Sequence, residues 1–99
     1  MILYDALVIK SWANRATQRF AEEDKSRFTG LDEALARRRL RLLDEAERLQ
    51  DLTGLKSVGL HRLRGARKDQ WAISAGGPWR ITFEFRDGHA WNVEIIDYH

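Results

Sequence analysis

The chain has 99 residues, no cysteine and a formal net charge of +2. At this length one domain can bury roughly two thirds of its unfolded surface, so a single domain over residues 1–99 with an ordinary apolar core is expected. The lack of cysteine excludes disulfides, thiolate metal sites and cysteine nucleophiles. No apolar run approaches the roughly 20 residues of a membrane span, and no charged leader precedes an apolar core, so we expect a cytoplasmic protein without a membrane partner.

Positive charge is concentrated in one part of the chain. Residues 1–55 hold ten basic and ten acidic side chains, whereas residues 56–86 hold seven basic and two acidic ones. The seven are Lys56, Arg62, Arg64, Arg67, Lys68, Arg80 and Arg86. Such a cluster is typical of a surface that binds a phosphate backbone, and ordinary solvated surface is an equally good interpretation on charge alone.

The first half of the chain predicts one strand and two helices. The apolar run from Ile2 to Ile9 is long enough for a strand. Residues 13–28 follow a helical pattern, with Phe20 on its apolar face. Thr29 and Asp32 resemble a capping box, which predicts a second helix that starts there and ends near Gly54.

The second predicted helix carries a block of arginines at positions 37–39, together with Arg41. Asp44, Glu45 and Glu47 follow within reach of three- and four-residue pairings. A helix face covered by ion pairs is therefore the favoured interpretation, and a contact surface for a partner protein is the second.

The last thirty residues predict an antiparallel meander. Large apolar side chains alternate with polar ones at Trp79, Ile81, Phe83 and Phe85, and again at Trp91, Val93 and Ile95. Asp87-Gly88 predicts a two-residue hairpin turn between these stretches, and Gly76-Gly77-Pro78 separates them from a strand over 70–75. Because three strands alone are marginal, we expect an α+β domain in which the helices cover one sheet face and leave a polar, basic face open.

Two of the three histidines lie where chemistry is conceivable. His61 precedes the meander within a basic segment and His99 follows Asp97-Tyr98 at its end, whereas His89 is most simply an exposed hairpin residue. Two imidazoles near arginines suit RNA cleavage, in which one takes the proton of the ribose 2′-hydroxyl and the other protonates the departing 5′-oxygen. From chemistry alone, the commoner interpretation of His99 is a residue of a frayed terminus, and that of His61 is a solvated loop residue. No metal-ligand spacing, phosphate-binding glycine loop or serine triad is present.

The second half also resembles a known family, the HigB toxins of the RelE/ParE superfamily of bacterial toxin–antitoxin systems. The resemblance covers about the last forty residues, and the first half agrees in its strand, helix, helix pattern. The matching residues are Leu60-His61-Arg62-Leu63-Arg64-Gly65, Arg67, Trp71, Ile73, Trp79-Arg80-Ile81-Thr82-Phe83, Phe85, Gly88, Val93 and Asp97-Tyr98-His99. It implies a RelE-like fold with two N-terminal helices on an antiparallel sheet of about four strands, in the order strand, helix, helix, strand, strand, strand.

The resemblance further implies a function and a set of site residues. The function is that of a growth-inhibiting endoribonuclease that cuts translated messenger RNA in the ribosomal A site by 2′-hydroxyl attack, without a metal or other cofactor. Its catalytic residues would be His61, Arg80, Asp97, Tyr98 and His99, with Arg80 on the scissile phosphate. The predicted RNA-binding residues are Arg62, Arg64, Arg67 and Lys68. A helix-turn-helix antitoxin of the HigA kind would hold the toxin inactive, and operator DNA would be reached only through that complex.

Two other functions remain open from the sequence. A ParE-like gyrase poison would not need the histidines or the terminal Asp-Tyr-His, so their presence argues against it. A catalytically weak interaction module, acting with its antitoxin as co-repressor, would have the same residue types in an unproductive geometry.

Overall fold

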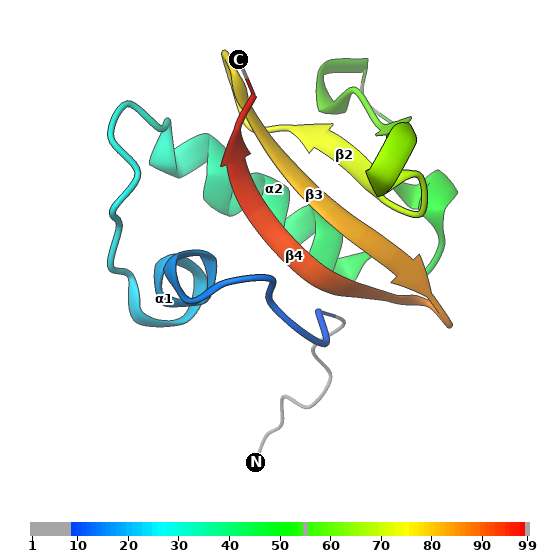
Figure 1. Cartoon of the computed structure of the whole chain (residues 1–99), viewed down its shortest axis with the longest axis horizontal. Coiled ribbons are helices and arrows are strands. Elements are labelled where there is room, and N and C mark those ends of the chain that lie inside the picture. Colours follow the sequence, from blue (N-terminus) through cyan, green and yellow to red (C-terminus); the bar gives the residue numbers. More distant parts are fainter. Residues whose placement is uncertain (1–8, 55, 99) are drawn as a thin grey trace.

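The computed structural model describes residues 9–54 and 56–98, and in this part of the chain two helices pack with one four-stranded antiparallel sheet (Figure 1). The elements are α1 (Arg15–Glu23), α2 (Glu33–Glu45), β1 (His61–Arg62), β2 (Trp71–Ser74), β3 (Trp79–Arg86) and β4 (His89–Asp97), with single 3-10 turns η2 (Leu49–Leu52), η3 (Lys56–Val58) and η4 (Gly65–Arg67). The predicted α+β class is therefore confirmed. None of the helices in the described ranges is long and apolar enough to cross a bilayer.

The sheet is a meander in which the strands stand in chain order, β1-β2-β3-β4. The three predicted C-terminal strands are present, and the hairpin between β3 and β4 turns on Asp87 and Gly88, both with positive φ (53° and 78°) as a tight two-residue turn requires. The fourth strand is β1, from the basic segment before the meander. The predicted N-terminal strand, residues 2–9, lies outside the described residues except for Ile9, which bridges in parallel to Ala90 on the outer edge of β4.

Helix α1 is shorter than the sequence pattern predicts. It begins at Arg15 because the Asn14 side chain caps it, accepting a hydrogen bond from the Thr17 backbone N–H at 2.9 Å. It ends at Glu23 because Asp24 takes a left-handed conformation (φ 57°). The helical pattern over residues 24–28 therefore does not continue the helix.

Helix α2 differs from its prediction at both ends. The N-cap is Asp32 itself, whose carboxylate accepts a hydrogen bond from the Leu35 N–H at 3.1 Å, so Thr29 lies outside the helix. The helix stops at Glu45 rather than near Gly54. Asp51 accepts hydrogen bonds from the backbone N–H groups of Glu47 and Arg48 at 2.9 and 3.0 Å, which lowers the pKa of its carboxyl group and folds the chain into η2.

Two arginines of the block on α2 contact partners outside the helix. Arg37 pairs with Asp24 and donates to the Phe20 carbonyl at 2.9 Å, so it joins the two helices. Arg39 is buried, and its guanidinium donates to the carbonyl oxygens of Ser74 at 3.0 Å and Ser57 at 3.3 Å. These two side chains fix α2 to its neighbours. Arg38, which lies between them in the sequence, is exposed to solvent.

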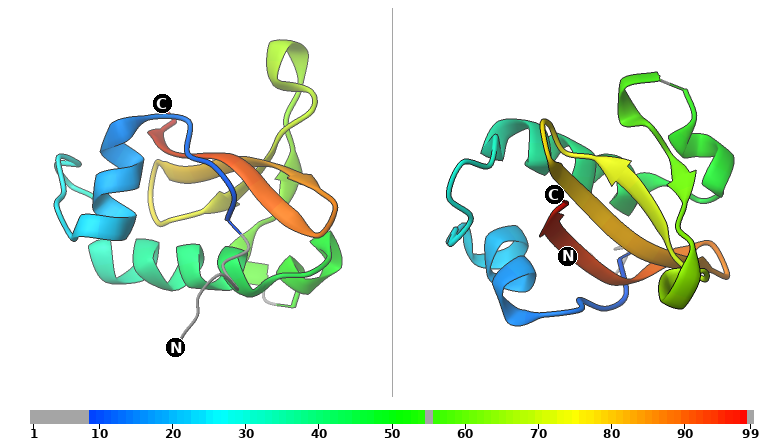
Figure 2. Two further views of the ribbon diagram at one scale, coloured as in Figure 1. Left: turned by 90° about the horizontal axis from the view of Figure 1, so that it is seen from below. Right: turned by 45° about the horizontal axis from the view of Figure 1, so that its top comes forward.

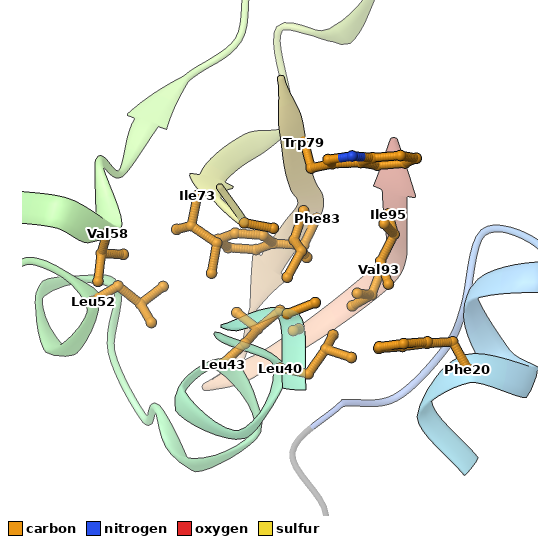
Figure 3. Close-up of a cluster of buried hydrophobic side chains, with 14 of the residues drawn as sticks. Phe20, Leu40, Leu43, Leu52, Val58, Ile73, Trp79, Phe83, Val93 and Ile95 are labelled. Atoms are coloured by element: carbon orange, nitrogen blue, oxygen red, sulfur yellow. The ribbon is translucent and has the colours of Figure 1, made fainter. Parts of the chain in front are cut away.

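The core lies between α2 and one face of the sheet, with α1 closing the side next to β4 (Figure 2). Figure 3 shows Leu40 and Leu43 of α2 pointing toward Phe83, Val93 and Ile95 of the sheet. Leu43, Phe83 and Val93 have no exposed surface, and burial of each contributes about 1.5–3 kcal/mol. The predicted apolar face of β3 is confirmed, with Trp79, Ile81 and Phe83 buried and Phe85 half-buried.

The apolar alternation predicted for β4 is interrupted by a β-bulge. Thr82 pairs with Glu94 but Glu84 pairs with Trp91, so β4 has one residue more than β3 between these positions. Asn92 takes up the extra residue with φ 53°, a conformation that asparagine tolerates better than most residues. As a result Val93 and Ile95 face the core while Trp91 does not, contrary to the prediction that all three share one face.

Candidate active site

The sheet face opposite α2 brings together residues from all four strands. In register, His61 pairs with Ala72, Ala72 with Thr82, and Thr82 with Glu94, so these positions form one row across the sheet. Arg80 lies in the next row on the same face, because it is two residues from Thr82 on β3. We call this the open face. The turn η4 stands on this side of the sheet, as the left view of Figure 2 shows.

His61 lies at the edge of the open face, on β1, and is exposed. Its Nδ1 atom is 3.2 Å from the Gly59 carbonyl oxygen. Because a carbonyl oxygen can only accept, this contact assigns the proton to Nδ1 and leaves Nε2 directed away from the backbone. Nε2 is therefore the atom that can take a proton from a ligand, or give one when the ring is charged.

Arg80 lies nearer the end of the sheet where β4 terminates. Its Nη1 donates to the carbonyl oxygens of Gly77 and Trp79, each at 2.8 Å, which holds the guanidinium at the turn between β2 and β3. Nε and Nη2 make no hydrogen bond to an acceptor within the described residues. They remain available to an anion on the open face.

Tyr98 shares this end of the open face. Its backbone N–H donates to the Pro78 carbonyl at 2.7 Å, which continues the β3–β4 ladder by one step. Arg80 pairs with Ile96, so Tyr98 is its diagonal neighbour, at a Cα separation of roughly 7–8 Å. The Tyr98 side chain is 45% exposed, which makes it the large apolar residue that the described surface leaves most open. Arg80 and Tyr98 therefore lie close together at this end of the open face.

The remaining catalytic candidates are placed differently. Asp97 pairs with Trp79 and by alternation points to the other side of β4 from Tyr98. His99 lies outside the described residues. His61 is three strands away from β4, and the register puts its Cα roughly 12 Å from that of Arg80 along the sheet. The open face therefore orders the candidates as His61, Arg80 and Tyr98, with the arginine in the middle.

The four predicted RNA-binding residues all lie in or beside η4, but they are held in different ways. Arg62 donates from Nε to the Lys68 carbonyl at 2.9 Å and its guanidinium stands 5.7 Å from the centre of the Trp71 ring. Arg64 and Lys68 are exposed. Arg67 reaches across the open face, where Nη2 forms an ion pair with Glu94 Oε1 of β4 at 3.1 Å.

A hollow of about 450 Å³ lies next to this basic turn, where β3 extends beyond β2. Arg62, Trp71 and Phe85 contribute to its walls, together with Asp69, Glu84 and Arg86. Trp71 pairs with Phe83 and so faces the core side, whereas Glu84 pairs with Trp91 on the open face, so the hollow lies at the edge of the sheet between the two faces.

Sequence reasoning missed Glu94. Its carboxylate accepts hydrogen bonds from Arg67 at Oε1 and from Asn14 Nδ2 at Oε2, the latter at 3.3 Å. One side chain of β4 thereby joins η4 to the cap of α1. The pattern of β4 marks Glu94 as polar, but only the bulge at Asn92 reveals which face it occupies.

Metal binding finds no support in the described ranges. Within residues 9–54 and 56–98, no three histidine, aspartate or glutamate side chains stand close enough to hold a metal ion. His89, predicted to be exposed, is instead half-buried at the start of β4.

The fold and this face define a small α+β protein whose sheet carries arginines, a histidine and a tyrosine on its open side. Comparison with protein families assigns it more closely. The model of the RelE-like toxin of type II toxin–antitoxin system HigB matches residues 10–99, and the chain belongs to this family. A related protein is the endoribonuclease HigB of Proteus vulgaris, which is 38% identical over 61 residues. That match spans 62% of this chain and 65% of the relative.

Proposed function

We propose that this toxin is an endoribonuclease that cuts messenger RNA on translating ribosomes. The observation that carries the proposal is the open face, which presents His61, Arg80 and Tyr98 in sequence across one sheet, with a basic turn beside them. Membership of the toxin family and the related endoribonuclease support the coarser part of the proposal, a toxin that cleaves RNA.

In the proposed reaction, the ribose 2′-hydroxyl attacks the adjacent phosphorus. The 2′-oxygen loses its proton to a base and forms a bond to phosphorus, the bond to the 5′-oxygen breaks, and an acid protonates that oxygen. The products are a 2′,3′-cyclic phosphate and a 5′-hydroxyl end. Because the nucleophile belongs to the substrate, no metal-bound water is needed.

His61 and His99 are the proposed acid and base. The Nδ1 contact of His61 with Gly59 leaves Nε2 to exchange the proton with RNA. Arg80, between His61 and Tyr98, would hold the scissile phosphate through Nε and Nη2, where negative charge increases in the transition state. Tyr98 and Asp97 would donate to and orient the reacting groups at the end of β4.

Substrate binding is assigned to the basic turn. Arg64 and Lys68, both exposed, would contact phosphates, and Arg67 would do so from the open face. Arg62 lies against Trp71 at the rim of the hollow, an arrangement in which a base can stack while its phosphate meets the guanidinium.

The proposed partners are the ribosome with its messenger RNA, and a helix-turn-helix antitoxin of the HigA kind that keeps the toxin inactive. Operator DNA would be bound only by the complex with that antitoxin.

The test is to express the protein with and without its antitoxin and to map RNA ends in translating ribosomes. New 5′-hydroxyl ends within codons, present only when antitoxin is absent, are the expected result. Growth arrest without such ends would reject the nuclease and point to another target, such as gyrase. Absence of growth arrest would favour a non-catalytic co-repressor.

A further inference from the structure

We propose that Glu94 is a positioning residue of the open face, which holds Arg67 and with it the turn η4 in place for RNA. This inference rests on the proposed function, since it assigns a task within the same site. Its basis is one ion pair that spans the sheet.

The ion pair joins parts of the chain that the sheet itself keeps apart. Arg67 belongs to the connection between β1 and β2, whereas Glu94 lies on β4, two strands beyond β2. Their side chains meet at 3.1 Å and are 37% and 23% exposed, so the pair is partly shielded from solvent. Thr82, which pairs with Glu94 in the sheet, is only 1% exposed, so the middle of the open face is shielded from solvent beside this ion pair.

The turn has few other attachments to the sheet. The backbone hydrogen bonds of residues 63–70 are local: Leu63 N–H donates to the Gln70 carbonyl, and the N–H groups of Arg67, Lys68 and Gln70 donate to carbonyl oxygens within the turn. These bonds shape the turn but do not fix it relative to β4. The pair with Glu94 supplies that constraint, and Arg64 and Lys68 move with the same turn.

Glu94 is itself held from the opposite side. Asn14 Nδ2 donates to its Oε2 at 3.3 Å while Asn14 Oδ1 caps α1, so both carboxylate oxygens have a partner. The second nitrogen of the guanidinium, Arg67 Nη1, is buried without a hydrogen-bond partner in the described residues. Within the described residues, the ion pair with Glu94 is therefore the contact through which the Arg67 guanidinium holds the turn.

The experiment compares Glu94→Gln with the unmodified protein in two measurements. Glutamine keeps an oxygen for Asn14 but removes the charge that holds Arg67. Amide hydrogen exchange of Leu63, Arg67, Lys68 and Gln70 should become about fivefold faster, the factor expected for loss of a partly exposed ion pair. The KM for RNA cleavage on programmed ribosomes should rise by a similar factor, whereas kcat should stay within about twofold.

Two further variants make the test specific. Arg67→Gln removes the pair from the other side and should give the same faster exchange, and adding Glu94→Gln to it should cause no further change in exchange or KM. Glu84→Gln is the matched control, because Glu84 also forms an ion pair on the open face, with Arg86 at 3.4 Å, and glutamine keeps an oxygen for the hydrogen bond from Asn92 Nδ2. It should leave the exchange of the turn unchanged.

Unchanged exchange in Glu94→Gln would overturn the inference, whatever the cleavage result. Faster exchange with normal KM would also overturn it, because the turn would then be held without consequence for RNA. If the unmodified protein cuts no RNA, the proposed function fails and the positioning role fails with it, whereas normal cleavage by Glu94→Gln rejects the positioning role alone.

Discussion

Replacement of Arg80 by alanine separates catalysis from folding. The substitution removes two hydrogen bonds from Nη1 to backbone carbonyls, on a half-buried side chain. We expect this to lower the free energy of unfolding by about 1–2 kcal/mol. For a domain of this size each kcal/mol corresponds to a fall in Tm of roughly 4–8 °C.

The effect of Arg80→Ala on cleavage should be much larger. Loss of a donor to the transition-state phosphate costs about 2.7–4 kcal/mol, which is a fall of roughly 10²–10³ in kcat. The assay is cleavage of messenger RNA on programmed ribosomes, at a temperature where thermal denaturation shows the variant to be folded. Arg38→Ala is the matched control, since Arg38 is exposed on α2, away from the open face, and its loss should alter neither measurement appreciably.

The opposite pattern would refute this reasoning. The carbonyl contacts of Arg80 also fit a structural arginine that closes the turn at Gly77. If Arg80→Ala unfolds far below the expected temperature while the folded fraction cuts RNA normally, the side chain serves the fold and the phosphate contact is wrong.

Substitutions at four other positions test separate parts of the molecule. His61→Ala and His99→Ala should each abolish growth arrest and leave antitoxin binding intact, and undiminished killing by both variants would reject the nuclease mechanism. Asp51→Asn should lower Tm at neutral pH, and the difference from the unmodified protein should shrink as the pH falls below about 4, because the lowered pKa means that the stabilisation exists above the ordinary pKa and is lost on protonation. A constant difference across that range in thermal melts would contradict the assigned contacts. At Asn92, alanine should destabilise more than glycine by about 1 kcal/mol, because φ is positive there, and equal melting of the two variants would argue against the bulge.

Periodicity predicted the elements well where burial alone decides the pattern. Alternation along β3 predicts its buried face with Ile81 and Phe83. The turn at Asp87-Gly88 follows from the backbone angles that these two residues allow. The end of α2 could not be predicted in this way. The leucine pattern continues past Glu45, but the Asp51 carboxylate captures the N–H groups of Glu47 and Arg48, and a side-chain contact of this kind has no periodicity.

The candidate site shows a similar division. The basic character of the segment around η4 is visible in the composition, and the position of Arg80 on the polar side of its strand follows from alternation with Ile81. The pairing of Arg67 with Glu94 joins residues 27 apart in the chain, and no local pattern predicts it. The sequence also did not predict β1 as the edge strand beside β2, because a strand of only two residues has no recognisable alternation.

The bulge at Asn92 determines which residues of β4 reach the open face. Glu84 and Trp91 are paired on this face, so strict alternation would place Val93 and Ile95 there and turn Glu94 toward the core. The extra residue reverses the order, and Glu94 and Tyr98 join Arg80 while Val93 and Ile95 stay buried. Ser11 supports this arrangement, since its Oγ accepts from Asn92 N–H at 2.8 Å and its carbonyl oxygen from Val93 N–H at 3.0 Å. The segment before α1 therefore contributes to the proposed RNA site, because Ser11 holds Asn92, the bulge residue that determines which side chains of β4 reach the open face.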